Sequence, residues 1–102
     1  MTDGSPRYWK YSPGGVLSED GAYQVSGRDR FSYYFRKNGT VAILPCEHFE
    51  KNGTPTVAFD FRERIELAYR DGSRSLTPDD IDEIKHVLLD AMPLMGRAVV
   101  FD

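Results

Sequence analysis

Apolar and polar residues alternate along three runs between residues 30 and 61, and two Asn-Gly pairs separate these runs. An Asn-Gly pair favours a type I′ turn, because both central residues of that turn have positive φ. The turns Asn38-Gly39 and Asn52-Gly53 therefore predict a three-stranded antiparallel meander. Its strands are expected at Arg30–Lys37, at Thr40–Cys46 continuing through Glu47–Lys51, and at Thr54–Phe61.

Two-residue turns also set the register of the meander, with Lys37 opposite Thr40 and Lys51 opposite Thr54. Residues directly opposite each other share a face of a sheet. The predicted inner face is apolar and places Phe31 opposite Cys46 and Leu44 opposite Phe61; its members are Phe31, Tyr33, Phe35, Ala42, Leu44, Cys46, Val57, Phe59 and Phe61. The opposite face keeps four large apolar residues, namely Tyr34, Val41, Ile43 and Phe49.

A helix is predicted near the C-terminal end of the chain. Thr77 is a suitable N-cap and Pro78 a suitable first residue. Pro93 and Gly96 are expected to end the helix. Apolar residues between these limits recur at helical spacing; they are Ile81, Ile84, Val87, Leu88, Ala91, Met92 and Met95.

Shorter patterns complete the expected fold. Residues 1–6 are expected to be a disordered lead, and Arg7–Tyr11 an edge strand or a segment crossing the sheet. Further strands are expected at Val16–Ser18, Ala22–Val25, Ile65–Tyr69 and Arg97–Phe101. The apolar stripe of the helix needs a partner, and the inner face of the sheet is the large apolar surface for it. We therefore predict a single α+β domain over residues 1–102, a two-layer antiparallel meander with one long helix on one face.

Composition and charge narrow the function classes. The formal net charge of −3 is too small to favour a nucleic-acid binder held mainly by electrostatics, so no nucleic acid is expected as a partner. Residues 71–102 carry seven acidic and three basic groups, net −4. One cysteine cannot form an internal disulfide and fits a reducing compartment. With no signal-like N-terminus and no long apolar run, we expect a soluble cytoplasmic protein without membrane contact.

Cys46 and His48 are the pair that most suggests chemistry, because residues two apart on a strand share a face. A zinc site needs three or four ligands, however, and the chain has one Cys and two His. His86 lies near Asp82 on the helix, yet no nucleophile motif accompanies them. We therefore expect a buried thiol, no metal, no cofactor and no enzyme. One alternative stays open, a small enzyme with a site around Cys46, His48 and Tyr34.

Two surfaces are candidates for partner binding. The first is the polar side of the helix, called here the acidic helix face; it comprises Asp79, Asp82, Glu83, His86 and Asp90. Its charge favours docking of a basic protein. The second is the sheet face opposite the helix, which is too apolar to be fully wet and is expected to be covered by Arg7–Tyr11, by a second copy of the chain or by a partner.

The order of motifs resembles the small immunity proteins of bacterial polymorphic toxin systems, most closely the immunity protein 74 family. The resemblance covers roughly residues 14 to 102. It rests on Gly15-Val16, the Tyr-rich strand after it, Gly39-x-Val41-x-Ile43 with Glu47, Ile65-x-x-x-Tyr69, Leu76-Thr77-x-x-Asp80 before Ile84, Leu88 and Ala91, then Gly96 and Val99-Val100-Phe101-Asp102. Two features depart from the family pattern: Tyr69 replaces an expected Trp, and acidic residues follow the helix cap where basic ones are expected.

The resemblance implies a non-enzymatic inhibitor that binds and neutralises a cognate toxin, often a basic nuclease. The acidic helix face would then contact the toxin. The alternative from a different class is a regulatory or phage-type accessory domain that forms a homodimer through the open face of its sheet.

Overall fold

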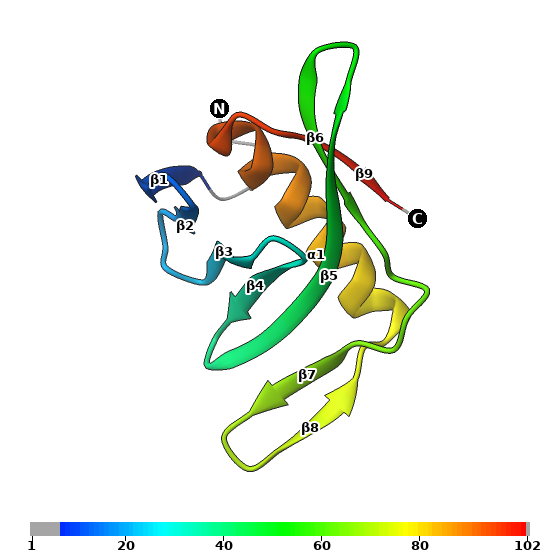
Figure 1. Cartoon of the computed structure of the whole chain (residues 1–102). Helices are drawn as coiled ribbons and strands as arrows, with labels where there is room; N and C mark the ends of the chain where they lie inside the picture. Colours follow the sequence, from blue (N-terminus) through cyan, green and yellow to red (C-terminus); the bar gives the residue numbers. More distant parts are fainter. Residues whose placement is uncertain (1–6, 102) are drawn as a thin grey trace.

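The computed structural model describes residues 7–101, so the predicted lead over residues 1–6 lies outside the described residues. The fold is mixed α+β, a curled, open and mostly antiparallel sheet with one C-terminal α-helix (Figure 1). In chain order the elements are β1 (Tyr8–Ser12), β2 (Gly15–Ser18), β3 (Tyr23–Asp29), β4 (Ser32–Lys37), β5 (Thr40–Lys51), β6 (Thr54–Phe59), β7 (Glu66–Tyr69), β8 (Gly72–Ser75), α1 (Pro78–Ala91), the 3-10 helix η1 (Met92–Met95) and β9 (Ala98–Phe101).

The two predicted Asn-Gly hairpins are confirmed. Asn38 and Gly39 have φ values of 46° and 79°, and the second pair has 54° and 80°. The register is also as predicted, with Lys37 paired to Thr40 and Cys46 paired to Phe59. Strand β5 is continuous through both hairpins, pairing with β4 along its first half and with β6 along its second half.

Phe31 is not on the inner face, which corrects one expectation. Strand β4 begins at Ser32, and Asp29 pairs with Ser32, so Arg30 and Phe31 are the central residues of the β3–β4 turn. The Asp29 carboxylate accepts hydrogen bonds from the Phe31 amide and the Ser32 hydroxyl, at 2.8 and 2.9 Å. The Phe31 carbonyl still accepts a bond from the Cys46 amide, but the Phe31 side chain is 67% exposed.

The expected pairing of Leu44 with Phe61 is also wrong. Strand β6 ends at Phe59. One residue later, the Asp60 amide donates a hydrogen bond of 3.2 Å to the Pro45 carbonyl of β5. The Asp60 carboxylate then accepts a hydrogen bond from the amide two residues later, which turns the chain away from β5. Phe61 instead lies half-buried beside the ring of Phe101, at 5.9 Å between centroids.

The helix begins and ends as predicted. The Thr77 hydroxyl accepts a hydrogen bond from the Asp80 amide, while the Asp80 carboxylate accepts one from the Thr77 amide, which completes a capping box. The chain leaves η1 at Gly96, whose φ of 74° lies in the left-handed region that favours glycine. The apolar stripe packs into one core with the inner side chains of the sheet; the buried helical members are Ile84, Val87, Leu88, Ala91 and Met92.

Three strands differ from expectation or extend it. Residues 72–75 form β8, which pairs with β7, and no strand was expected there. The last strand, β9, pairs with β6 in parallel, in an otherwise antiparallel sheet. Strand β1 is the edge strand beside β2, one of the two expected positions. The sheet is thus wider and more curled than a simple meander.

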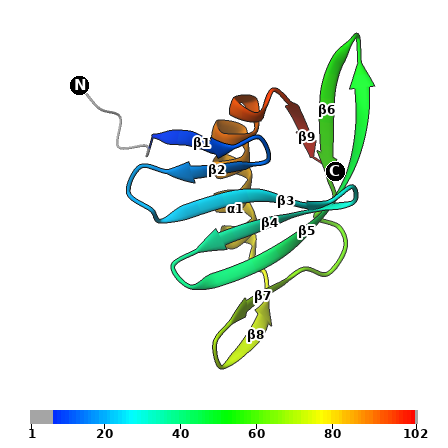
Figure 2. The same cartoon turned by 60° about the vertical axis from the view of Figure 1, so that its left-hand side comes forward.

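The helix leaves one side of strands β1–β5 uncovered. In Figure 2 the helix lies behind these strands, and their other side faces the viewer. The β5–β6 hairpin projects beyond the helix at one end, and the β7–β8 hairpin projects at the opposite end (Figures 1 and 2). No helix within residues 7–101 has the length and apolar character needed to cross a membrane.

Candidate functional site

The uncovered side of strands β1–β5 carries a group of apolar and aromatic side chains, called here the outer face. The strand registers align one row across it, from Trp9 through Leu17 and Gln24 to Arg36 and Val41. Since this row alternates with the buried row of the core, its side chains point away from the helix. The outer face comprises Trp9, Tyr11, Leu17, Tyr34, Arg36, Val41 and Ile43.

Three large apolar members of the outer face are exposed to solvent. Trp9 is 61% exposed, Tyr11 50% and Ile43 45%. The sequence placed Tyr34, Val41, Ile43 and Phe49 on this side of the sheet. Phe49 lies farther along β5, where that strand pairs with β6, and is 42% exposed. The sequence did not place Trp9 and Tyr11 on this side, although the alternating pattern of Arg7–Tyr11 was the available signal.

The aromatic rings of the outer face are held in place by contacts within the protein. The Tyr11 hydroxyl accepts a hydrogen bond from the Gln24 amide nitrogen, at 2.6 Å. The Tyr11 ring lies so close over Gly15 that a Cβ atom there would come within 2.5 Å of it. The Arg36 guanidinium lies over the Tyr34 ring, 4.6 Å from its centroid. Rings ordered in this way lose little conformational entropy when a partner covers them.

The acidic helix face is divided by the fold. Asp79, Asp82, His86 and Asp90 are exposed. Glu83 instead turns toward the sheet, where its carboxylate accepts a 2.7 Å hydrogen bond from the Lys37 ammonium and one of 2.6 Å from the Tyr23 hydroxyl. The role of the face in partner binding stays a prediction.

The contacts of Glu83 affect the pKa values of the groups involved. Desolvation of the Glu83 carboxyl favours its neutral form, but the hydrogen bonds from Lys37 and Tyr23 outweigh this effect and lower its pKa. The hydrogen bond to Glu83 raises the pKa of Tyr23 to about 12, with burial contributing in the same direction. Glu83 is therefore ionised at neutral pH and joins α1 to strands β3 and β4.

Cys46 and His48 are neighbours, and the thiol is buried. The Cys46 sulfur lies 4.0 Å from His48 Nε2. Burial raises the pKa of the Cys46 thiol to about 11, and the nearby charges of Asp29 and Glu47 add to this effect. Because the thiolate is the nucleophile, the protonated form at neutral pH is a poor one.

The alternative site around Cys46, His48 and Tyr34 is not assembled. Tyr34 pairs with Ile43 on the outer face, whereas Cys46 belongs to the buried core. Within residues 7–101, His, Cys, Asp and Glu side chains form no group of three that could hold a metal ion. The pair Cys46–His48 remains a contact in the fold without a third functional group from Tyr34.

Comparisons with protein-family models, with curated proteins and with solved structures find no match for this chain. The resemblance to the immunity protein 74 family therefore stays a prediction, based on the motifs of this sequence.

Proposed function

We propose that this protein is a non-enzymatic binding protein that docks a different protein on its outer face, and that it serves as a cytoplasmic immunity protein against a bacterial toxin. The observation that carries the proposal is the exposure of Trp9, Tyr11, Arg36 and Ile43 on one uncovered sheet face. Trp, Tyr and Arg are the residues most enriched among those that dominate protein–protein binding energy.

The chemistry of the outer face favours a protein over a nucleic acid. Among the members of the outer face, Arg36 is the one basic side chain, and its guanidinium lies against Tyr34. Binding a polyphosphate chain requires several Lys or Arg residues to neutralise phosphates. A protein surface with apolar residues and one carboxylate opposite Arg36 fits this face better.

The position of Arg36 also favours a different protein over a second copy of the chain. Strand β4 is the central strand of the path β1-β2-β3-β4-β5-β6-β9. A two-fold axis through the middle of the outer face would bring Arg36 of one copy against Arg36 of the other. Like charges in contact disfavour such a dimer. The alternative, a regulatory or phage-type accessory domain, would need this dimer.

The acidic helix face is the second candidate contact surface. Its support is the net charge of −4 over residues 71–102 and the exposure of Asp79, Asp82, His86 and Asp90. Charge of this kind mainly steers a basic partner and accelerates association. It would act beside the outer face rather than replace it.

A capture experiment with several parallel baits tests the proposal. The wild-type protein, Ile43→Asp and Asp82→Lys are used as parallel baits in a lysate of the source bacterium. The expected result is a toxin domain captured by the wild-type protein and by Asp82→Lys, and lost with Ile43→Asp. Co-production of the wild-type protein should also protect cells from the captured domain. Ile43→Thr, which keeps a branched side chain at the same position, is the matched control.

Three outcomes would contradict the proposal. Capture that is unaffected by Ile43→Asp would remove the outer face from the interaction. A captured protein without toxic activity would remove the immunity role. A stable homodimer in sedimentation, dissolved by Ile43→Asp, would favour the accessory-domain alternative.

A further inference from the structure

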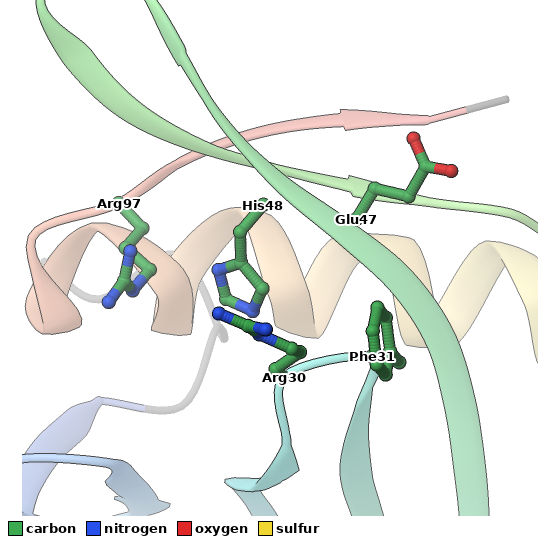
Figure 3. Close-up of a pocket in the computed structure, with 5 residues that line it drawn as sticks. All are labelled: Arg30, Phe31, Glu47, His48 and Arg97. Atoms are coloured by element: carbon green, nitrogen blue, oxygen red, sulfur yellow. The ribbon is translucent and has the colours of Figure 1, made fainter.

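An open cavity of about 670 Å³ lies between the β3–β4 turn, strand β5 and the segment that precedes β9. It is lined by Arg30, Phe31, Glu47, His48 and Arg97 and is called here the basic cavity. The basic cavity is separate from the outer face, because His48 lies on the same inner side of β5 as Cys46, two residues earlier. Figure 3 shows the Arg30 guanidinium next to the His48 ring, and Arg97 to one side of this ring on a separate segment.

The two arginines of the basic cavity have no carboxylate partner among the described residues. The Arg30 guanidinium lies 6.0 Å from the centroid of the Phe31 ring, and the Arg97 amide donates to the Met92 carbonyl. Glu47 is the acidic residue of the lining, but its carboxylate points away from the arginines (Figure 3). Elsewhere in the described residues, Arg28, Arg62, Arg64 and Arg74 each have a carboxylate partner, whereas Arg7, Arg36 and Arg70 have none.

The charges of both arginines affect the pKa of His48. Its pKa is lowered by desolvation first, then by the charges of Arg97 and Arg30. The imidazole is therefore neutral at pH 7 and offers one N–H donor between the two guanidinium groups. Its ring also lies 5.8 Å from the ring of Tyr33, which supports its orientation. The basic cavity thus presents two positive charges and a neutral donor.

We propose that the basic cavity binds the phosphate group of a small aromatic phosphate ester, of which a mononucleotide is the simplest representative. Two guanidinium groups match the charge and the several acceptor oxygens of a phosphate dianion, whereas a single carboxylate would pair fully with only one of them. Phe31, displaced from the core into the β3–β4 turn, offers an exposed ring on which a planar base stacks. The volume exceeds what a phosphate group alone requires.

A longer nucleic-acid strand fits the basic cavity less well. Such strands need a basic groove that tracks several phosphates, and the lining contributes two arginines with one acidic residue. The cavity therefore suits one phosphate and one ring.

Titration calorimetry and NMR of the full chain test the proposal with inorganic phosphate, the four ribonucleoside monophosphates and the corresponding nucleosides. We expect the monophosphates to bind and to shift the His48 resonances, with an affinity about tenfold above that of inorganic phosphate because of the stacked base. Nucleosides without phosphate should not bind measurably. Raising the salt concentration should weaken the binding.

Four variants identify the residues involved. Arg97→Gln and Arg30→Gln should each weaken monophosphate binding by about tenfold or more, the usual effect of removing a charge-assisted hydrogen bond. Arg30 lies in an exposed turn, so its variant tests the cavity even if Arg97→Gln impairs folding. Phe31→Ala should weaken the monophosphates and leave inorganic phosphate unchanged. Arg64→Gln, at an exposed arginine outside the cavity, should change nothing.

The proposal is overturned if none of the monophosphates binds, or if Arg30→Gln and Arg97→Gln leave binding unchanged. It is also overturned if inorganic phosphate binds as tightly as the monophosphates, since the ring would then contribute nothing. None of these measurements involves the outer face. Their failure would therefore not affect the proposal that a protein partner docks there.

Discussion

The Cys46 side chain illustrates how the fold controls the chemistry of a single residue. Its thiol was expected in the core from the register of the hairpins, and it is buried there between inner-face residues. Burial rather than the neighbouring His48 determines its reactivity, because desolvation is the largest contribution to its raised pKa. A reactive thiolate would have required an electropositive and accessible position.

The reactivity of Cys46 gives a first prediction. At pH 7.5, iodoacetamide should label the native protein far more slowly than the protein unfolded in urea, because the pKa of the thiol is about 11 and the sulfur is buried. Mass spectrometry of the intact chain over time provides the measurement. Stoichiometric labelling of the native protein within minutes would contradict a buried, protonated thiol and would revive a catalytic role for Cys46.

Glu83 gives a second prediction, which concerns pH. Its folded-state pKa is lowered, so the unfolded chain binds more protons between the two pKa values. The stabilisation is therefore present above the unfolded value of 4.5 and is lost as the pH falls through the lower folded value. Glu83→Gln should reduce the free energy of unfolding at pH 7 by about 0.5 to 1 kcal/mol, as for a partly exposed ion pair.

The difference between wild type and Glu83→Gln should shrink in urea unfolding at progressively lower pH. The other carboxylates with lowered pKa values, including Asp29, Asp60 and Asp80, are present in both proteins, so their effects cancel in the comparison. A difference that stays constant from pH 7 to below the folded pKa would show that the charge of Glu83 does not contribute.

At the scale of elements, the sequence predicts hairpins and helix well because each has strong local signals. Asn38-Gly39 requires positive φ, and Thr77-Pro78 marks a helix start, so both could be located without tertiary information. Phe31 was misplaced for a local reason that the hydrophobic pattern does not reveal. The Asp29 carboxylate accepts hydrogen bonds from the Phe31 amide and the Ser32 hydroxyl, and these bonds favour a turn at Arg30-Phe31 over a strand.

Strands β8 and β9 depend on long-range pairing, which the sequence signals weakly. Residues 72–75 are polar and exposed, and they become a strand by pairing with β7. The parallel pairing of β9 with β6 depends on where α1 and η1 end relative to the sheet. Arg97, which immediately precedes β9, could therefore not be placed beside His48 from the sequence.

Two adjacent leucines test the packing of α1 on the sheet. Leu88 is fully buried and Leu89 is 52% exposed, so the pair provides its own control. Leu88→Ala should lower the free energy of unfolding by about 2 to 5 kcal/mol, through lost burial and the cavity left behind. Leu89→Ala should change it by less than about 0.5 kcal/mol. Equal losses in urea unfolding would contradict the observed orientation of the helix.

At the scale of the whole molecule, the central feature is that one helix covers one side of a wide, curled sheet (Figure 2). The sequence anticipated the apolar character of Tyr34, Val41 and Ile43 on the other side. It left open what lies over them, and the structure places β1 at the edge rather than across the face. Trp9 and Tyr11 therefore enlarge the outer face instead of covering it.

The most direct test of this feature is the affinity of the purified captured partner for three forms of the protein, measured by titration calorimetry. Ile43→Asp should weaken binding by about 30-fold or more, the loss typical of a residue that dominates an interface. Asp82→Lys, on the acidic helix face, should stay within about twofold of the wild type, since exposed charges mainly affect the association rate. The reverse pattern, an affinity lost with Asp82→Lys and kept with Ile43→Asp, would contradict docking on the outer face.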